Sequence, residues 1–409
     1  MEPGGYRMES LILFDDAFYE ILRHMPSFGT ERLPVSQALG RVLAQDAASR
    51  VDVPPFSRSM MDGYAIHADN LHRGEMLKVL NTVAAGATPT VTVTPGHAVR
   101  VMTGAPIPDG TAAVVRDEWC DVIDESTIQV LKVIARGESI QHQGEDGPRQ
   151  TKLLTSGTRL TELELAVLQT FGVTSIEVRK TPVATLLITG SELVQDIEQE
   201  LHGGQIYGTN DILLRGALEK DGVLVERVAY IPDDPMLLQE AVETARESSD
   251  LVILTGGVSV GDFDYTPSAI EASGSTIHIR KVLMRPGSPL LFATSGQTAF
   301  FGLSGNPAAC FAQFSVLVRP AIRRAMGQED SPFPHSAVLT HDLSLKPIKH
   351  TRVQRARLSV ENGNVYVDSQ MSQSSGVISS LLQTGAYIRI NESELKAGTV
   401  VPIRIIREL

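Results

Sequence analysis

Four short runs of small and acidic residues in the second half of the chain have the composition of an anion-binding site. They are Thr189-Gly190-Ser191-Glu192, Pro232-Asp233-Asp234-Pro235, the run 256–264, and Ser304-Gly305-Asn306-Pro307. Amides of glycine-rich turns and of helix N-termini hold oxyanions, whereas carboxylates hold hard cations such as Mg²⁺. Together the runs predict a site for a phosphate-bearing ligand and a divalent cation.

The run 256–264 is the most informative of the four because it follows an apolar stretch, 251–254, that reads as a strand buried on both faces. We expect amides from Gly256, Gly257, Ser259 and Gly261 to face a ligand, and the carboxylates of Asp262 and Asp264 to be candidates for binding a cation. A lone Gly-Gly turn with an acidic tip is more often an ordinary solvated loop. The three companion runs favour the functional interpretation.

The elements between these runs alternate between strands and helices, which predicts a doubly wound α/β domain. The expected strands are 183–188, 223–230, 251–254, 277–282, 290–292 and 299–303, with helices at 209–220, 235–248 and 307–326. Parallel strands place their carboxyl ends at one edge of the sheet, so the runs should converge there, and Lys281 and Arg285 should arrive on the same side. No GxxxxGK[ST] motif occurs, which argues against an ordinary ATPase.

The rest of the chain predicts three further parts around the α/β domain, which we place at 182–328. Residues 51–148 alternate apolar and polar residues with frequent Gly and Pro, as in a β-rich inserted domain, and 329–409 resemble a small β-barrel or sandwich. The flanking segments 8–50 and 149–181 form a segmented helical part. Within it we expect helices at 11–25, 37–44 (capped by Ser36) and 158–168, the last with a Thr161–Glu164 capping box.

Composition excludes several function classes. The 409 residues carry a formal net charge of −12 and only 5% aromatic residues, which argues against a nucleic-acid or anionic-membrane binder. No apolar run approaches the roughly 20 residues that span a bilayer, and the first residues do not read as a signal peptide, so we expect a cytoplasmic protein. The two cysteines, Cys120 and Cys310, lack CxxC spacing and are expected to be reduced.

Nine motifs in order give the chain a specific resemblance to the molybdopterin molybdenumtransferases, a family related to the C-terminal part of gephyrin. They are PPFSRSMMDGYAI, VMTGAPIPDGTAAVV, GEDG, TGSEL, GGQIYGTN, TGGVSVGDFDYT, RPGSP, GLSGNP and RARLSVENG followed by SSGVISSL. The resemblance implies an enzyme that inserts molybdate into adenylylated molybdopterin, with Mg²⁺-dependent release of AMP. It also implies a homodimer with a shared active cleft, and a molybdopterin adenylyltransferase as substrate donor.

The resemblance also implies roles for individual residues. Asp62, Thr103 and Asp146 would come from the partner subunit's inserted domain, while Asp234 and Asp264 would bind Mg²⁺. The other implied catalytic residues are Glu192, Lys281 and Arg285. The implied ligand-binding residues are Thr189, Gly190, Gly256, Gly257, Ser259, Gly261, Gly305, Asn306, Pro307 and Ser375.

The chain departs from the family pattern at several positions. Ser57-Arg58 replaces an Asp-Asn pair, Arg285 and Ser288 replace the two lysines of a K-P-G-K-P loop, and Ser304 replaces a proline. Two alternatives to the molybdenum-inserting enzyme therefore stay open. One is a divergent paralogue that binds molybdopterin or a partner without turnover, and the other is a nucleotidyltransferase that adenylylates molybdopterin.

Overall fold

The computed structural model describes residues 11–258 and 264–407, which form two compact units. The first unit contains the described residues within Met1–Glu31, Gly40–Ala44 and Val178–Leu409. The second contains Arg32–Leu39 and Gln45–Glu177. No helix in the described part of the chain is long and apolar enough to cross a membrane.

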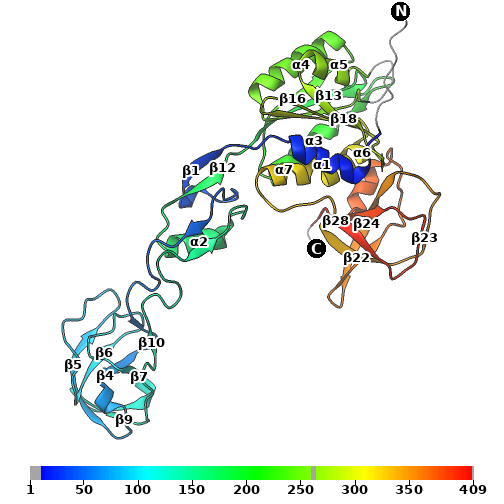
Figure 1. Ribbon diagram of the computed structural model, residues 1–409. Helices are drawn as coiled ribbons and strands as arrows, with labels where there is room; N and C mark the ends of the chain where they lie inside the picture. Colours follow the sequence, from blue (N-terminus) through cyan, green and yellow to red (C-terminus); the bar gives the residue numbers. More distant parts are fainter. Residues whose placement is uncertain (1–10, 259–263, 408–409) are drawn as a thin grey trace, which may run out of the picture. The chain divides into compact units, whose positions relative to one another are not determined.

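The first unit is built on a six-stranded sheet (Figure 1). Four strands run parallel, and β20 lies antiparallel between its two neighbours. Their order across the sheet is β16 (Leu224–Ile231), β13 (Val183–Thr189), β17 (Leu251–Thr255), β21 (Thr298–Leu303), β20 (Pro289–Ser295) and β18 (Thr276–Lys281). The predicted strands are thus present, and the carboxyl ends of all of them except the antiparallel β20 share one edge.

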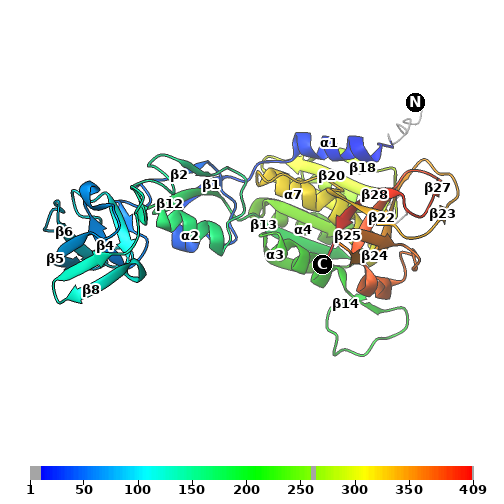
Figure 2. The ribbon, with the colours of Figure 1, turned by 90° about the horizontal axis from the view of Figure 1, so that it is seen from below.

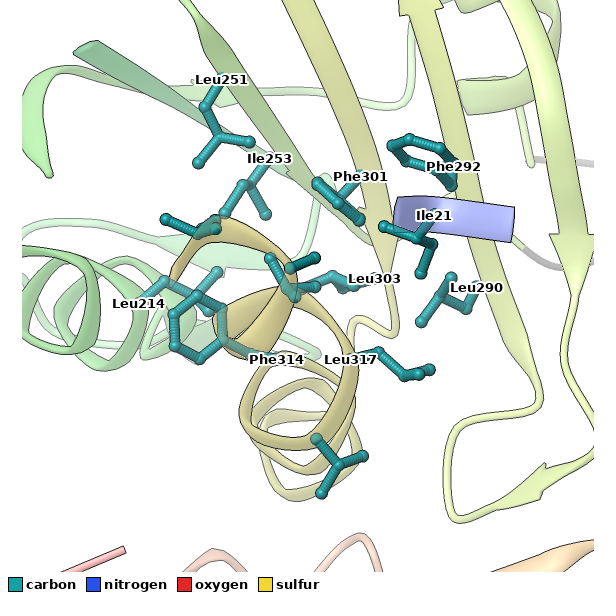
Figure 3. Close-up of a cluster of buried hydrophobic side chains, with 14 of the residues drawn as sticks. Ile21, Leu214, Leu251, Ile253, Leu290, Phe292, Phe301, Leu303, Phe314 and Leu317 are labelled. Atoms are coloured by element: carbon teal, nitrogen blue, oxygen red, sulfur yellow. The ribbon is translucent and has the colours of Figure 1, made fainter. Parts of the chain in front are cut away.

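Helices cover both faces of this sheet, as a doubly wound fold requires. Successive side chains of β17 point to opposite faces: Leu251 and Ile253 join one core cluster, and Val252 and Leu254 join the other. The first cluster is covered by α1 (Phe14–His24), α3 (Asn210–Lys220), α6 (Pro307–Gln313) and α7 (Arg319–Ala325), and the second by α4 (Pro235–Ser248) and α5 (Thr266–Ala272). Figure 3 shows side chains of the first cluster, which come from strands, from α1 (Ile21), from α3 (Leu214) and from the segment that contains Phe314.

The predicted helix from 307 to about 326 forms in three parts. A π-helical turn, Phe314–Val318, joins α6 to α7, and every side chain of that turn is buried. A π turn rotates the part of the helix that follows it. Both α6 and α7 can therefore bury apolar side chains in the first cluster.

The C-terminal part of the first unit is a closed five-stranded barrel (Figure 2). Its strands, in order, are β24 (Thr351–Glu361), β25 (Asn364–Asp368), β22 (His335–Leu339), β28 (Val400–Ile405) and β26 (Ala386–Ile390). The barrel closes because β24 also pairs with β26. A short strand of the α/β part, β19 (Met284–Arg285), pairs with β24 and so connects the two parts.

The second unit holds the β-rich region. Its six-stranded sheet has the order β7 (Ala113–Arg116), β4 (Gly63–Ile66), β6 (His97–Val101), β5 (Met76–Val83), β9 (Thr127–Val130) and β8 (Cys120–Asp124). Helix α2 (Glu162–Thr170) also belongs to it, and the predicted Thr161–Glu164 capping box is present. The shorter strands of the chain are β1 (Thr30–Pro34), β2 (Ala47–Ala48), β3 (Arg58–Ser59), β10 (Ile140–Gln141), β11 (Lys152–Leu154), β12 (Ser175–Arg179), β14 (Leu193–Val194), β15 (Ile206–Tyr207), β23 (Leu343–Ser344) and β27 (Glu394–Leu395).

One predicted helix, 37–44, is wrong. The structure has only a 3₁₀ turn, Val35–Gln37, and the Ser36 side chain does not cap a helix. Gly40 follows with φ +75°, which ends the helical path, and Leu43 pairs as an isolated bridge with Val178. The apolar residues of this segment have helical spacing, but the chain buries them without forming a helix. The four-domain boundaries remain a prediction.

A buried ion-pair network fixes the barrel to the α/β part. Asp221, just after α3, accepts hydrogen bonds from Arg319 Nε and Arg323 Nη2, both at 2.6 Å. Asp330 accepts from Arg323 at 3.3 Å and from Arg404 of β28 at 2.7 Å. Burial by itself would lower the pKa of Arg323, but the two carboxylates outweigh it and the pKa is raised. The network therefore holds charged side chains from α3, α7, the interdomain segment and the barrel in one cluster.

We expect Asp221→Asn to lower the free energy of unfolding by roughly 3–5 kcal/mol, because it leaves the buried guanidinium of Arg319 without its carboxylate partner. Urea denaturation followed by far-UV circular dichroism measures the loss. Glu219→Gln is the matched control, since it removes an exposed pair with Arg215 on the same helix and should cost at most about 0.5 kcal/mol. Equal effects of the two changes would contradict a supporting role for the network.

Candidate active site

Three of the four predicted runs meet at the carboxyl edge of the sheet. Gly256, after β17, has φ +92°, and a Cβ there would lie 2.5 Å from Thr189 Oγ1. A Cβ on Gly305, after β21, would lie 3.4 Å from the Gly256 Cα. The junction is closed by hydrogen bonds from Thr189 Oγ1 to the Thr255 oxygen and from the Gly256 amide to the Leu303 oxygen, both at 3.0 Å. Only glycine permits backbones to approach this closely.

This junction coincides with the point where the chain order in the sheet reverses. From β13 the chain passes through α3 to β16 on one side, and then through α4 to β17 on the other. Helix α3, which follows β13, and α5, which follows β17, lie on opposite faces of the sheet. Ligands of open α/β sheets bind at such a point, so Thr189, Gly190, Gly256 and Gly257 border a candidate position for a ligand.

The run 232–235 contacts the run 189–192 through Asp233. The Ser191 amide donates to Asp233 Oδ2 at 3.0 Å, and the Asp233 amide donates to Ser191 Oγ at 2.9 Å. Glu192 folds back toward this edge, since its carboxylate lies 2.6 Å from the position of a Cβ on Gly190. Asp234 caps α4: its Oδ1 accepts from the amides of Met236 at 2.8 Å and Leu237 at 3.1 Å.

The predicted cation ligands Asp234 and Asp264 each lie near the start of a helix, α4 and α5. Asp264 lies two residues before Thr266, the first residue of α5, and Thr266 Oγ1 donates to the Gly256 oxygen at 3.2 Å. Ser259, Gly261 and Asp262 fall outside the described residues. Within the described ranges, one group of three potential metal ligands lies close together, and neither aspartate belongs to it. A magnesium site shared by these two aspartates remains a prediction.

A cavity of about 490 Å³ lies between the α/β part and the barrel. Arg285 and Ser304 line it from the α/β side, and Arg352 and Ser375 line it from the barrel side. Its other lining residues are Pro286, Gly287, Pro289, Ala309, Val353, Gln354, Gln373 and Ser374. Burial and the charge of Arg285 both lower the pKa of Arg352. Two guanidinium groups facing one polar space form a site that favours an anion.

The remaining predicted residues of the first unit surround this cavity and the junction. Lys281 ends β18 and pairs with Pro289, so it lies beside the loop of Arg285. Pro307 begins α6, and Asn306 occupies the capping position without a side-chain capping bond. The Asn306 Oδ1 atom is buried and has no hydrogen-bond partner among the described residues, so it is available to a ligand.

Gln313 is a site residue that the sequence analysis missed. Its fully buried amide accepts from the Ser304 amide at 2.8 Å and donates to the oxygens of Gly287 at 2.8 Å and Pro289 at 2.6 Å. It therefore connects the two loops that line the cavity from the α/β side. A glutamine amid the apolar residues of 308–318 is the signal that could have found it, because a buried polar side chain requires partners.

Arg355 is a second missed residue, on the barrel side. Its side chain is buried, and its Nη2 donates to the oxygens of Ser372 and Ser374 at 2.9 Å. In the described part of the chain its Nε and Nη1 atoms have no hydrogen-bond partner, and burial lowers its pKa. Gln373 completes the arrangement by accepting from the Arg355 amide at 2.9 Å. Arg355 thus shapes the loop that brings Ser374 and Ser375 to the cavity.

In the second unit, the structure brings two of the three predicted residues together. Thr103 donates to Asp62 Oδ1 from both its amide, at 2.7 Å, and its hydroxyl, at 2.8 Å. These hydrogen bonds lower the pKa of Asp62. Asp146 is exposed, and its amide donates to the Val53 oxygen at 3.0 Å.

Comparison with known proteins matches three regions of this chain to family descriptions. Residues 12–172 match the MoeA N-terminal region (domain I and II), 185–324 a probable molybdopterin binding domain, and 336–406 the MoeA C-terminal region (domain IV). The chain is 33% identical to a molybdopterin molybdenumtransferase of Bacillus subtilis, covering 96% of this chain and 94% of that protein. This chain belongs to the molybdopterin molybdenumtransferase family.

Further relatives agree with that membership. The molybdopterin molybdenumtransferase of Haemophilus influenzae is 32% identical over 96% of this chain and 98% of its own. The crystal structure of a molybdopterin biosynthesis MoeA protein from Pyrococcus horikoshii superposes with a TM-score of 0.82, at 30% identity, over 97% of this chain and all of that one. The predicted family, its multidomain fold and its class of enzyme, a transferase, are confirmed.

We expect Gly256→Ala to destabilise the junction more than backbone strain alone explains. The added methyl group would collide with Thr189, whereas Gly274→Ala has a similar φ of +76° and open space around it. Gly274→Ala should cost about 1–3 kcal/mol from strain, and Gly256→Ala clearly more. Chemical denaturation of both variants makes the comparison, and equal losses would contradict a close-packed junction.

Proposed function

We propose that this chain inserts molybdate into adenylylated molybdopterin, with Mg²⁺-dependent release of AMP, to form the molybdenum cofactor. The observation that carries the proposal is the cavity lined by Arg285, Arg352 and Ser375, which also reaches Ser304, next to the glycine-rich junction of the sheet. Relatives over nearly the whole chain are molybdopterin molybdenumtransferases, which supports the same activity.

The cavity has the composition that a tetrahedral oxyanion requires. Molybdate carries two negative charges, which the guanidinium groups of Arg285 and Arg352 would balance, and the hydroxyls of Ser304 and Ser375 would donate to its oxygens. Lys281 lies beside the same loop and would add positive charge. Neutralising the oxyanion makes the molybdenum more electrophilic, so attack by the two dithiolene sulfurs becomes easier.

The junction would bind the phosphate and pterin portion of the substrate. The turns at Gly257 and Gly305 lie at the edge where ligands bind in such sheets, whereas the amides of Gly190 and Gly256 donate to the oxygens of Ile231 and Leu303. Asn306 offers its buried Oδ1 to a donor on the pterin, and Pro307 leaves the first turn of α6 open. Thr189 would position the junction rather than react, since its hydroxyl is used within the chain.

The acidic residues at this edge fit a hard cation. Carboxylates of Asp234 and Asp264, supported by Glu192, would hold Mg²⁺, which when bound neutralises the phosphate charge of the adenylate linkage. Water then replaces AMP at phosphorus, so no covalent enzyme intermediate is needed. The cysteines agree with this: burial raises the pKa of Cys120 to about 12 and also raises that of Cys310, so neither is a thiolate at neutral pH.

We further propose that Asp62, Thr103 and Asp146 act across a homodimer, each cleft receiving them from the partner subunit. The lowered pKa of Asp62 supports this proposal, because the carboxylate stays charged and is exposed to solvent in its own unit. A molybdopterin adenylyltransferase would supply the substrate, and the cytoplasm would be the compartment. Sedimentation equilibrium that shows only monomer at micromolar concentration would contradict the shared cleft.

A second function, molybdopterin binding without turnover, is favoured by the serines that replace basic or rigid residues of the family pattern. Ser288 donates to the Val282 oxygen at 2.9 Å, and Ser304 Oγ accepts from the Asn306 amide at 3.3 Å. Both hydroxyls thus stabilise their own loops. The cavity consequently has one basic side chain fewer than the two-lysine loop would provide.

Arg352→Gln should raise the molybdate concentration that supports half-maximal cofactor formation by roughly 10–100-fold, because it removes a hydrogen bond to a charged ligand. The assay supplies adenylylated molybdopterin, Mg²⁺ and varied molybdate. Arg357→Gln is the control, since Arg357 lies on the same strand but is exposed and bonds to Gln383 and Asp368. An unchanged molybdate dependence in the Arg352 variant would contradict the anion site.

Asp264→Ala should abolish molybdate-dependent cofactor formation while the fold survives. Glu243→Ala, on the exposed surface of α4, is the acidic control and should retain activity. Full activity of the Asp264 variant would refute its assigned role. Isothermal titration with molybdopterin separates the second function, because tight binding by the unmodified chain without metal insertion would support it.

A further inference from the structure

A cluster of potential metal ligands lies away from the candidate active site. Glu20 and His24 are one turn apart on α1, and Glu20 Oε1 lies 3.1 Å from His24 Nε2. His278, on β18, contributes the third side chain. One ligand atom from each residue lies within 4.8 Å of the others, and all three side chains are half-buried.

We propose that Glu20, His24 and His278 form a binding site for a divalent transition-metal ion of the Zn²⁺ type, which joins α1 to β18. Two imidazoles and one carboxylate are the donor set that such ions prefer, with a remaining position for water. Mg²⁺ prefers oxygen ligands, so this site would not compete for the cation of the proposed reaction. The inference does not depend on the proposed function.

His278 has the features of a prepared ligand. Its Nε2 lies 2.8 Å from Thr294 Oγ1, a neighbouring strand's hydroxyl, which orients the ring and leaves Nδ1 for the ion. Outer hydrogen bonds of this kind accompany nearly all metal-bound histidines.

The two rings stack, which sets a condition on binding. Their centroids are 3.9 Å apart and their planes are inclined by 15°. The in-plane lone pairs of two stacked rings lie in nearly parallel planes, which do not meet close to both rings, so one ring must turn for both to reach the same ion. His24 is the ring that can turn, because it lies in the last turn of α1, whereas His278 is held by Thr294.

An ion here would complete the attachment of α1 to the sheet. The start of the helix is already fixed, because the Ile12 amide donates to the Lys281 oxygen at 3.3 Å and the Leu283 amide donates to the Ile12 oxygen at 2.8 Å. His24 is the last residue of α1, which lies beside β18 (Figure 2). Metal binding would therefore brace the other end of α1 on the strand that ends at Lys281.

The test titrates full-length, chelator-treated protein with Co²⁺, read by ligand-field absorption, and with Zn²⁺, read by calorimetry and thermal unfolding. The unmodified chain should bind one ion with imidazole ligation and unfold at a higher temperature with Zn²⁺. The His24→Ala/His278→Ala double variant should lose the imidazole-dependent absorption and the Zn²⁺-induced shift. Thr294→Val, which keeps all three ligands, should weaken binding by about 10–100-fold.

His72→Ala is the control, because His72 is exposed in the other unit and should leave binding unchanged. Absence of stoichiometric Zn²⁺ or Co²⁺ binding by the unmodified chain would overturn the proposal. Undiminished absorption in the double variant would overturn it as well, since the ion would then lie elsewhere. The Thr294 variant keeps the test decisive if the double variant does not fold, because equal affinity there would contradict the assigned orientation of His278.

Discussion

The candidate site depends on the buried ion-pair network that begins at Asp221. Arg319 and Arg323 of α7 share this carboxylate, and Arg323 and Arg404 share Asp330, so the charges compensate one another in a chain. Removing one member leaves a buried charge unpaired, which is far more costly than the pair itself is stabilising. Since Arg404 belongs to the barrel, the network determines where the barrel lies on the α/β part.

The cavity exists because of this arrangement. Its walls come from the loop 285–289 and Ser304 on one side and from 352–354 and 373–375 on the other. Short strand β19 pairs with β24, and Gln313 holds the two α/β loops in register. A second buried side chain, Arg355, holds the barrel loop. The cationic wall is therefore built from side chains whose positions are set by buried hydrogen bonds.

We propose that two kinds of anion recognition lie next to each other in this molecule. The junction of Thr189, Gly256 and Gly305 brings glycine-containing turns together at the sheet edge, a composition that suits a phosphorylated pterin. The cavity offers guanidinium groups and hydroxyls, which suits a small tetrahedral oxyanion. An enzyme that joins such an oxyanion to such a pterin needs both, and family membership agrees with that division.

The sequence by itself determined the order of the elements, the doubly wound class and the runs that meet at the sheet edge. These follow from local rules: apolar strands buried on both faces, glycines at turns, and parallel strands that end at one edge. It failed at 37–44, where apolar spacing suits either a helix or extended backbone, and Gly40 decides for the latter.

Only the tertiary structure decided which distant residues share a space. Arg352 and Gln313 belong to no motif, and the motif that begins at Arg355 gave that residue no role, because their importance arises from burial and from partners elsewhere in the chain. The same holds for His278, which meets Glu20 and His24 only because α1 packs beside β18. A sequence specifies its turns through neighbouring residues, whereas the contacts of a buried polar side chain are specified by the whole core.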